Sequence, residues 1–346
     1  METKIYHHKV DISWSLIQEL SKLDRFDAAW SSIEKESKND LTQLKTIATI
    51  RSIGSSTRIE GAQMSNEQVE ALLKNITISK FESRDEQEVA GYREALDIIC
   101  DAYDDLSIRE TDIKGLHNIL MKYSDKDLWH KGDYKQMSNA VEATMTDGSH
   151  KILFRTTEAG FATQDAMRSL TEWYNNDTEV HSLVKCALFT YEFLSIHPFQ
   201  DGNGRMSRLL SNLLLLKSGY KWIQYVSFEH EIESRKSEYY RMLRLCQAGR
   251  PNEDITPWVT FFLSCLANIQ QQLLAKLDHS NIQHKLSNRE QAIVDYVSTH
   301  SGCRSGEIIA ALGLPPASIK RSLSKLVENN ILQRSGSHQR PYYTTR

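Results

Sequence analysis

The sequence predicts a mainly α-helical protein with one β-hairpin and a small C-terminal winged-helix domain. Apolar residues recur at spacings of three and four along most of the 346 residues, as in Leu16, Leu20 and Leu23, which is typical of amphipathic helices. The six prolines and 15 glycines gather at a few points, where they divide the chain. A chain of 346 residues is too long for one small core, so we expect two or three structural units.

Residues 1–100 are predicted to form a helical N-terminal segment. Ser65, followed three residues later by Gln68, has the spacing of a capping box, in which each side chain bonds to the backbone of the other residue. Val69 and Leu72 then supply an apolar helical face. We therefore expect a helix to begin directly after Ser65.

Residues 101–275 are predicted to form the central helical body, interrupted by one hairpin. Between Gln136 and Arg155 apolar and polar residues alternate loosely around Asp147 and Gly148, a dipeptide that favours a tight turn between two strands. Because a helical body does not need a hairpin for its packing, we expect this one to have a function.

A polar stretch after Asp278 has the composition of a linker, and residues 283–346 are predicted to form a third unit. The apolar spacing predicts three short helices, over residues 289–299, 305–312 and 317–329, followed by two short strands. This order of elements is typical of a winged helix.

The composition indicates an ordinary globular protein of the cytoplasm. A net charge of −3 and an apolar fraction of 40% exclude a general polyanion-binding surface, so any contact with nucleic acid must be local. The five cysteines are odd in number and include no Cys-x-x-Cys pair, which favours reduced thiols. The N-terminus lacks an apolar signal core, and no apolar run reaches the roughly 18 residues of a membrane span. We expect a cytoplasmic protein without membrane contact.

The stretch from His197 to Arg208, HPFQDGNGRMSR, has the features of an anion-binding loop. Pro198 disfavours helix at His197, and Gly202 and Gly204 allow a tight turn with accessible N–H groups. The apolar run after Arg208 predicts a helix that begins near these glycines. The positive end of its dipole would then face the same space, which is the general arrangement for holding phosphate.

Three kinds of side chain complete this candidate site. Arg205 and Arg208 share a helical face and offer two planar forks to phosphate oxygens. Asp201 could hold a Mg²⁺ ion that bridges phosphates, and His197 could accept a proton from an incoming hydroxyl group. A lone Gly-x-Gly loop would be an ordinary turn, with the histidine in the core and the arginines on a solvated face. The complete set favours phosphate chemistry.

The sequence HPFQDGNGRMSR resembles the signature of the Fic family, in which the fixed residues are His, Phe, Asp or Glu, Gly-Asn-Gly-Arg and a final Arg. Every fixed position matches, and the resemblance covers about residues 40–265. It implies a Fic-type helical bundle and the activity of a protein adenylyltransferase. In that family the histidine deprotonates a Ser, Thr or Tyr hydroxyl group of a target protein. The hydroxyl oxygen then attacks the α-phosphorus of ATP, and pyrophosphate leaves.

Carried over by position, the resemblance makes His197 the catalytic base and Asp201 the Mg²⁺ ligand. The phosphate-binding residues that it implies are Gly202, Asn203 and Gly204 around the α- and β-phosphates, Arg205 at the β-phosphate region and Arg208 at the γ-phosphate. The Doc branch, which phosphorylates its target, carries lysine in place of Gly204. The glycine therefore favours adenylyl transfer over phosphorylation.

The segment Ser56-Thr-Arg-Ile-Glu60-Gly61 resembles the inhibitory motif of Fic proteins that carry an N-terminal restraint. On its own, the pattern also fits a helix end closed by glycine. Together, the two motifs predict that the Glu60 carboxylate forms a charge-assisted ion pair with Arg208, which could be bidentate. The arginine would then not be free to bind the γ-phosphate of ATP. The same glutamate could instead position water to remove AMP from a modified target, and the sequence does not separate these directions.

Tyr239, Tyr240 and Gln247 lie where the resemblance places residues around adenine. The tyrosines offer an aromatic wall and the amide offers a hydrogen-bonding edge. Relatives often carry asparagine where Gln247 stands. The alternative is a helix with one buried and one surface tyrosine.

The hairpin from Gln136 to Arg155 corresponds to the flap of the family, which implies that it holds a target segment by strand addition. Gly132-Asp-Tyr134-Lys135 precedes it and resembles a Gly-x-Tyr-Arg element, with lysine in place of arginine. The substitution keeps the positive charge but loses the planar fork.

The C-terminal unit supports a hypothesis of a different class. Lys320, Arg321 and Lys325 cluster in its expected recognition helix, which favours DNA binding, although docking to protein has equal support. Three functions are therefore considered. The protein is an adenylyltransferase restrained by Glu60, or the same site mainly removes AMP from a modified target, or the protein is a DNA-binding regulator whose central helical domain only senses nucleotide. Family habit adds self-modification and a homodimer as expectations.

Overall fold

The computed structural model describes residues 2–75, 81, 83–124, 129–144, 150–284, 286–329, 331–337 and 340–345. Helices dominate it, as predicted, and the chain divides into two compact units, Met1–Gln271 (unit 1) and Gln272–Arg346 (unit 2). The predicted segments 1–100 and 101–275 therefore share unit 1 almost entirely. All five cysteines are free thiols. None of the described helices is both long and apolar enough to cross a membrane.

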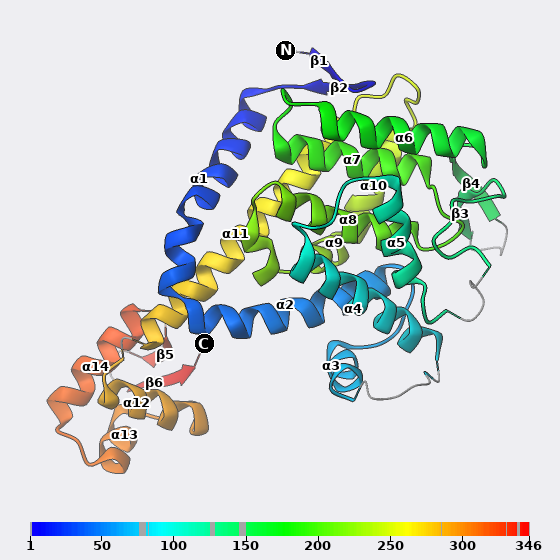
Figure 1. Cartoon of the computed structure of the whole chain (residues 1–346). Coiled ribbons are helices and arrows are strands. Elements are labelled where there is room, and N and C mark those ends of the chain that lie inside the picture. The colour runs from blue at the N-terminus through cyan, green and yellow to red at the C-terminus, as the bar shows by residue number, and fades with distance from the viewer. Residues whose placement is uncertain are drawn as a thin grey trace. The chain divides into compact units, whose positions relative to one another are not determined.

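Unit 1 is built mainly of helices (Figure 1). Its first half contains β1 (Glu2–Ile5), β2 (His8–Asp11), α1 (Trp14–Glu36), α2 (Lys38–Ile59), α3 (Asn66–Lys74), α4 (Arg84–Ala102) and α5 (Glu110–Leu120). Its second half contains β3 (Ala140–Thr144), β4 (His150–Arg155), α6 (Phe161–Asn176), α7 (Ser182–Ile196), α8 (Asn203–Lys217), the 3₁₀ helix η2 (Lys221–Tyr225), α9 (Phe228–Ser234) and α10 (Lys236–Gln247). The last helix, α11 (Thr256–His284), continues into unit 2.

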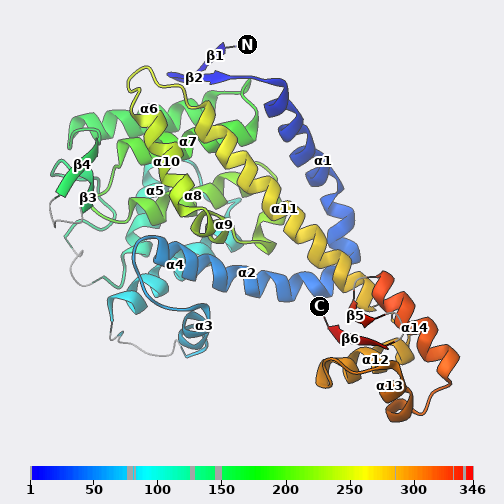
Figure 2. The same ribbon diagram turned by 180° about the vertical axis from the view of Figure 1, so that it is seen from behind.

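Helices α7 and α8 form the buried centre of unit 1. Every residue of α7 from Cys186 to Ile196 is buried, and α8 is buried from Arg205 to Leu216. A helix that is buried all round needs neighbours on every side, and α6, α4 and α11 supply them. Figure 2 shows α10 and α11 on the side that is turned away in Figure 1. The loop 197–202 therefore connects two immobilised helices.

The predicted hairpin is present. Strands β3 and β4 pair antiparallel from Ala140 opposite Arg155 to Thr144 opposite His150, with a bulge between Val141 and Glu142. The hairpin lies at the edge of unit 1, with β4 next to α10 (Figure 1). The expected turn at Asp147 and Gly148 lies outside the described residues.

The first hundred residues match the prediction except at their start. The capping box is confirmed, because the Gln68 N–H donates to Ser65 Oγ at 3.3 Å and the Ser65 N–H donates to Gln68 Oε1 at 2.8 Å. The β1–β2 hairpin was predicted as helix. Its strand conformation follows from long-range pairing, since the Lys9 N–H donates to the Glu253 carbonyl at 3.1 Å and its carbonyl accepts from Ile255 at 2.9 Å.

Unit 2 has the predicted order of elements. It contains α12 (Asn288–Thr299), α13 (Ser305–Leu312), α14 (Pro316–Glu328), β5 (Leu332–Ser337) and β6 (Arg340–Thr345). Its core includes Ile293, Val297, Ile319 and Leu323, which lie at helical spacing on α12 and α14. The winged-helix assignment of this unit stays a prediction.

Candidate active site

His197 lies at the end of α7 in a constrained backbone conformation. The helix ends at Ile196, as Pro198 predicts, and His197 adopts φ 54° and ψ 60°, in the left-handed region that L residues rarely occupy. The Phe199 N–H donates to Asn203 Oδ1 at 2.9 Å, so the amide nitrogen of this asparagine faces His197 Nδ1, 3.2 Å away. An amide nitrogen only donates, and the neutral imidazole therefore carries its proton on Nε2 and its lone pair on Nδ1.

The surroundings of His197 keep the imidazole neutral. Burial lowers the pKa of His197 to about 4, the Lys135 cation acts in the same direction, and the Glu60 and Asp201 carboxylates oppose both. An imidazole with such a pKa is unprotonated at pH 7 and is able to accept a proton.

The first turn of α8 holds an anion that belongs to the protein itself. Gly202 caps the helix with φ 79°, and the first helical N–H groups have no partner within the helix. A Cβ atom on Gly204 would lie 2.1 Å from Glu60 Oε1, so the Glu60 carboxylate rests directly against this turn. The positive end of the helix dipole favours a negative charge at this position.

Arg208 contacts both ends of the predicted inhibitory motif. Its side chain is 1% exposed, and Nη2 lies 2.7 Å from Glu60 Oε1. Nε donates to Ser56 Oγ and Nη2 to the Ser56 carbonyl, both at 2.9 Å, while Nη1 is buried with no hydrogen-bond partner among the residues that the structure describes. Although burial disfavours the cation, the Glu60 carboxylate raises the pKa of Arg208 above its usual range. The predicted pair is present as a single contact rather than a bidentate one, because Ser56 takes Nε and shares Nη2 with the carboxylate.

Arg205 and Asp201 belong to a separate group of charges. Arg205 is buried, with Nη1 3.4 Å from Glu88 Oε2 and Nη2 3.6 Å from Asp201 Oδ1. Glu88 also accepts a hydrogen bond from Arg84 Nε at 2.7 Å. The Asp201 side chain is 40% exposed at the mouth of the loop. A solvent-facing carboxylate of this kind fits Mg²⁺, which keeps most of its water and takes few protein ligands.

The structure brings together two of the three residues predicted to surround adenine. Tyr239 is buried within electrostatic range of Arg208 and Glu60, and the partly exposed Tyr240 ring lies 5.1 Å from it in an edge-on arrangement. The third residue, Gln247, is buried, and its amide donates to Ser195 Oγ at 3.1 Å. Its side chain thus ties α10 to α7.

A buried histidine that the sequence did not single out braces the loop. The His117 ring stacks on Phe199 with centroids 3.7 Å apart and planes 2° apart. Nδ1 accepts the Gly132 N–H at 2.9 Å, so Nε2 carries the proton and donates to the Asp201 carbonyl at 3.0 Å. Burial lowers the pKa of His117 to about 4. A single histidine on an amphipathic helix gave no signal for this role.

The end of α2 that carries Glu60 is fastened to its neighbours. Arg58 forms a bidentate pair with Glu233 of α9, with Nε to Oε1 at 2.7 Å and Nη2 to Oε2 at 2.9 Å. Lys236 Nζ donates to the Ile59 carbonyl at 2.7 Å and thereby caps the C-terminal end of the helix. These contacts set the position of the Glu60 backbone.

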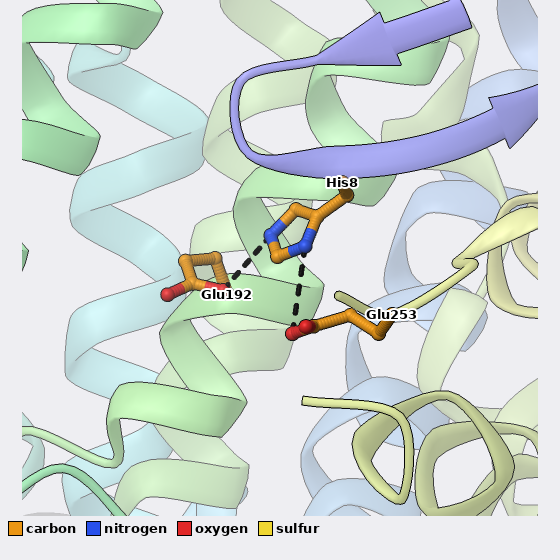
Figure 3. A group of neighbouring side chains, drawn as sticks. All are labelled: His8, Glu192 and Glu253. Atoms are coloured by element: carbon orange, nitrogen blue, oxygen red, sulfur yellow. Dashed lines mark hydrogen bonds and ion pairs between the residues drawn. The ribbon is translucent and has the colours of Figure 1, made fainter. Parts of the chain in front are cut away.

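A second group of buried titratable side chains lies beneath the β1–β2 hairpin (Figure 3). His8 Nε2 lies 3.0 Å from Glu192 Oε2, and His8 Nδ1 lies 3.5 Å from Glu253 Oε1. Arg250 Nη1 donates to both carboxylates at 2.9 Å. Because a guanidinium already pairs with both acids, we interpret the group as an ion network that ties β2 to α7 and to the turn before α11.

A cavity of about 760 Å³ opens elsewhere, between α2, α3 and α4. Its lining includes Leu41, Ile50 and Leu73 but none of the predicted site residues. The candidate site is therefore identified by the side chains of the loop 197–202 and not by the volume of a cavity.

Comparison with known proteins identifies relatives. Residues 107–215 match the family model of the Fic/DOC family. The protein adenylyltransferase Fic of Drosophila willistoni is 29% identical over 250 residues, which cover 71% of this chain and 45% of that protein. The protein adenylyltransferase Fic of Drosophila virilis is 27% identical over 306 residues, which cover 83% and 58%. The chain thus spans about half the length of these curated relatives.

Two solved structures share the fold. A Fic family protein from Desulfovibrio desulfuricans G20 aligns with a TM-score of 0.65 and 24% identity over 97% of both chains. A Fic domain-containing signaling protein from Bacteroides thetaiotaomicron VPI-5482 aligns with a TM-score of 0.60 and 24% identity, over 75% of this chain and 97% of that one.

Proposed function

This chain belongs to the Fic/DOC family through residues 107–215, and from that premise we propose that it transfers AMP from ATP to a hydroxyl group of a target protein. One observation carries the proposal: a neutral imidazole, a helix N-terminus that holds an anion and the Arg208 guanidinium meet within the loop 197–202 and the first turns of α8. This combination serves phosphate binding and proton removal together.

In the proposed reaction, a target Ser, Thr or Tyr hydroxyl displaces the Asn203 amide from His197 Nδ1, the unprotonated ring nitrogen, and His197 accepts the hydroxyl proton there. The hydroxyl oxygen forms a bond to the α-phosphorus of ATP. The bond from that phosphorus to the oxygen bridging the β-phosphate breaks, and pyrophosphate leaves with the electron pair. The first turn of α8 and Arg208 hold the negative charge of the phosphates. Asp201 would hold a Mg²⁺ ion, which neutralises phosphate charge when bound.

The Glu60 carboxylate restrains this reaction in the proposal. It lies against Gly204, where phosphate would bind, and it pairs with Arg208. ATP cannot use the helix terminus and the guanidinium fully while the carboxylate occupies both. Removal of AMP from a modified target, with Glu60 positioning water, is the alternative for the same residues.

Labelling with ATP that carries its label on the α-phosphate, in the presence of Mg²⁺ and cell lysate, tests the proposal. We expect Glu60→Gly to label itself or lysate proteins roughly sixfold to thirtyfold faster than wild type, the scale set by a lost charge-assisted contact. Adding His197→Ala should abolish the label, and Glu67→Gln, at an exposed acid on α3, should leave the wild-type rate unchanged. No transfer by Glu60→Gly, or equal transfer without His197, would overturn the proposal. ATP labelled on the γ-phosphate separates adenylyl transfer from phosphorylation.

DNA binding through unit 2 is a second proposal with narrower support. Lys320 and Arg321 are exposed on α14, whereas Lys325 Nζ lies 2.9 Å from Glu290 Oε1 and is engaged within the unit. A mobility shift of mixed duplex DNA that weakens steeply with salt would support it. Lys320→Glu together with Arg321→Glu should remove that shift.

A further inference from the structure

Lys135 holds an unusual position for a lysine. Its side chain is 1% exposed, and Nζ donates to Asn139 Oδ1 at 3.0 Å, Thr156 Oγ1 at 2.8 Å and the Ile196 carbonyl at 3.0 Å. Asn139 directly precedes β3 and Thr156 directly follows β4, so one ammonium group joins both ends of the hairpin. Its third acceptor is the last carbonyl of α7, where the negative end of the helix dipole favours a cation.

The backbone of Lys135 also contacts the loop that carries His197. Its N–H donates to the Pro198 carbonyl at 2.8 Å, and Tyr134 forms an isolated antiparallel bridge with Phe199. Lys135 therefore contacts the carbonyl groups on both sides of His197, through Nζ at Ile196 and through its backbone at Pro198. Because His197 adopts a left-handed conformation that is costly by itself, these contacts help to define the direction of its ring.

We propose that Lys135 is a positioning residue, which couples the base of the flap to the catalytic histidine and sets the orientation of its imidazole toward the target hydroxyl. This inference rests on the proposed function. In this proposal one ammonium group holds both the flap, along which the target segment binds, and His197, which deprotonates the target hydroxyl.

The charges around this lysine agree with that role. Among the described residues no carboxylate lies within ion-pair distance of Nζ, and burial lowers the pKa of Lys135 to about 8. The charged groups that act on His197 are Lys135, which lowers its pKa, and Glu60 and Asp201, which raise it. Loss of the Lys135 cation should therefore raise the pKa of His197.

The test uses the full chain with Glu60→Gly, so that the restraint is absent. In this parent, Lys135→Met should lower kcat about tenfold to a hundredfold, as expected for a misplaced catalytic group, and leave KM for ATP within about twofold. The acid limb of the kcat/KM profile should move to higher pH. Lys135→Arg should recover most of the rate, and Lys131→Met, at a partly exposed lysine of the same loop, should match the parent.

Two further readouts keep the inference open to refutation. The parent should lose activity above about pH 8, where Lys135 becomes neutral, and Lys135→Arg should shift this loss to higher pH. If Lys135→Met does not fold, the pH profile of Lys135→Arg tests the inference instead. An unchanged rate and pH profile in Lys135→Met, or the same basic limb in Lys135→Arg, would overturn the inference. Titration of the His197 ring by NMR measures its pKa without any AMP transfer. A parent that transfers no AMP therefore refutes the proposed function, whereas the titration still tests the effect of Lys135 on His197.

Discussion

Glu60 Oε1 lies 2.7 Å from Nη2 of Arg208, and the same oxygen occupies the space that a Cβ atom at residue 204 would require. One carboxylate thus neutralises the arginine and fills the anion site at the start of α8. A side chain at residue 204 would displace the carboxylate before it disturbed any backbone atom. The glycine is therefore required for this placement of Glu60, and in the proposed reaction it also leaves room for phosphate.

Replacing only the charge of Glu60 should release the restraint in part. Glu60→Gln keeps an oxygen acceptor but changes a charge-assisted hydrogen bond to a neutral one, a loss of roughly 1 kcal/mol or about a factor of five. We expect its labelling rate to lie between those of wild type and Glu60→Gly. A rate equal to wild type would show that the shape of the side chain, and not its charge, restrains the reaction.

The restraint should also weaken from a distance, through the contact that fastens α2. Glu233→Gln removes the charge that holds Arg58 in its bidentate pair, without touching Arg208 or the loop. We expect a labelling rate about two- to tenfold above wild type, since such pairs contribute on the order of 1 kcal/mol. Glu238→Gln, which breaks a pair with Arg235 at the start of α10, is the matched control and should have no effect.

Stability should fall as the pH drops below neutrality. His117 has an ordinary pKa of 6.5 when unfolded and about 4 when buried, so between these values the unfolded chain binds more protons than the folded one. The free energy of unfolding should therefore decrease with decreasing pH by up to about 1.4 kcal/mol per pH unit from this group. Urea unfolding at several pH values between 7 and 4 measures the slope. His117→Gln should be less stable at pH 7 but show a shallower slope; the same slope as wild type would assign the effect to other groups.

The buried network beneath the N-terminal hairpin should depend on its arginine. Arg250→Met leaves Glu192 and Glu253 without their shared cation, and breaking a buried pair in this way costs about 3–5 kcal/mol. Thermal unfolding should show a clear fall in Tm, whereas Arg241→Met, at an exposed arginine of α10, should change it little. A small change in both variants would show that water reaches these carboxylates.

Local signals in the sequence predicted much of the fold and the loop of the candidate site. The capping box at Ser65, the break before Pro198 and the hairpin residues all act over a few positions, and they are found where expected. Long-range pairing was not predictable in this way. The β1–β2 hairpin forms against residues 253–255, a partner more than two hundred residues away.

The contacts of the charged side chains were harder to predict than their presence. The motif identified Arg205 as a phosphate ligand, but in the structure it faces Glu88 of α4, which no local pattern connects to it. The Ser56 contact with Arg208 and the grip of Lys135 on both carbonyls beside His197 also depend on tertiary packing. Residue types in a motif thus indicate the chemistry, whereas their partners follow from the fold.

The single contact between Glu60 and Arg208 has a consequence for resting behaviour. Glu60 is 31% exposed and presents one oxygen to one nitrogen, so its hold is worth roughly 1–2 kcal/mol. At equilibrium, such a latch would stand open in roughly one molecule in six to one in thirty. The protein would then retain a low basal rate of AMP transfer. A binding partner would need to supply only this small free energy to separate Glu60 from Arg208.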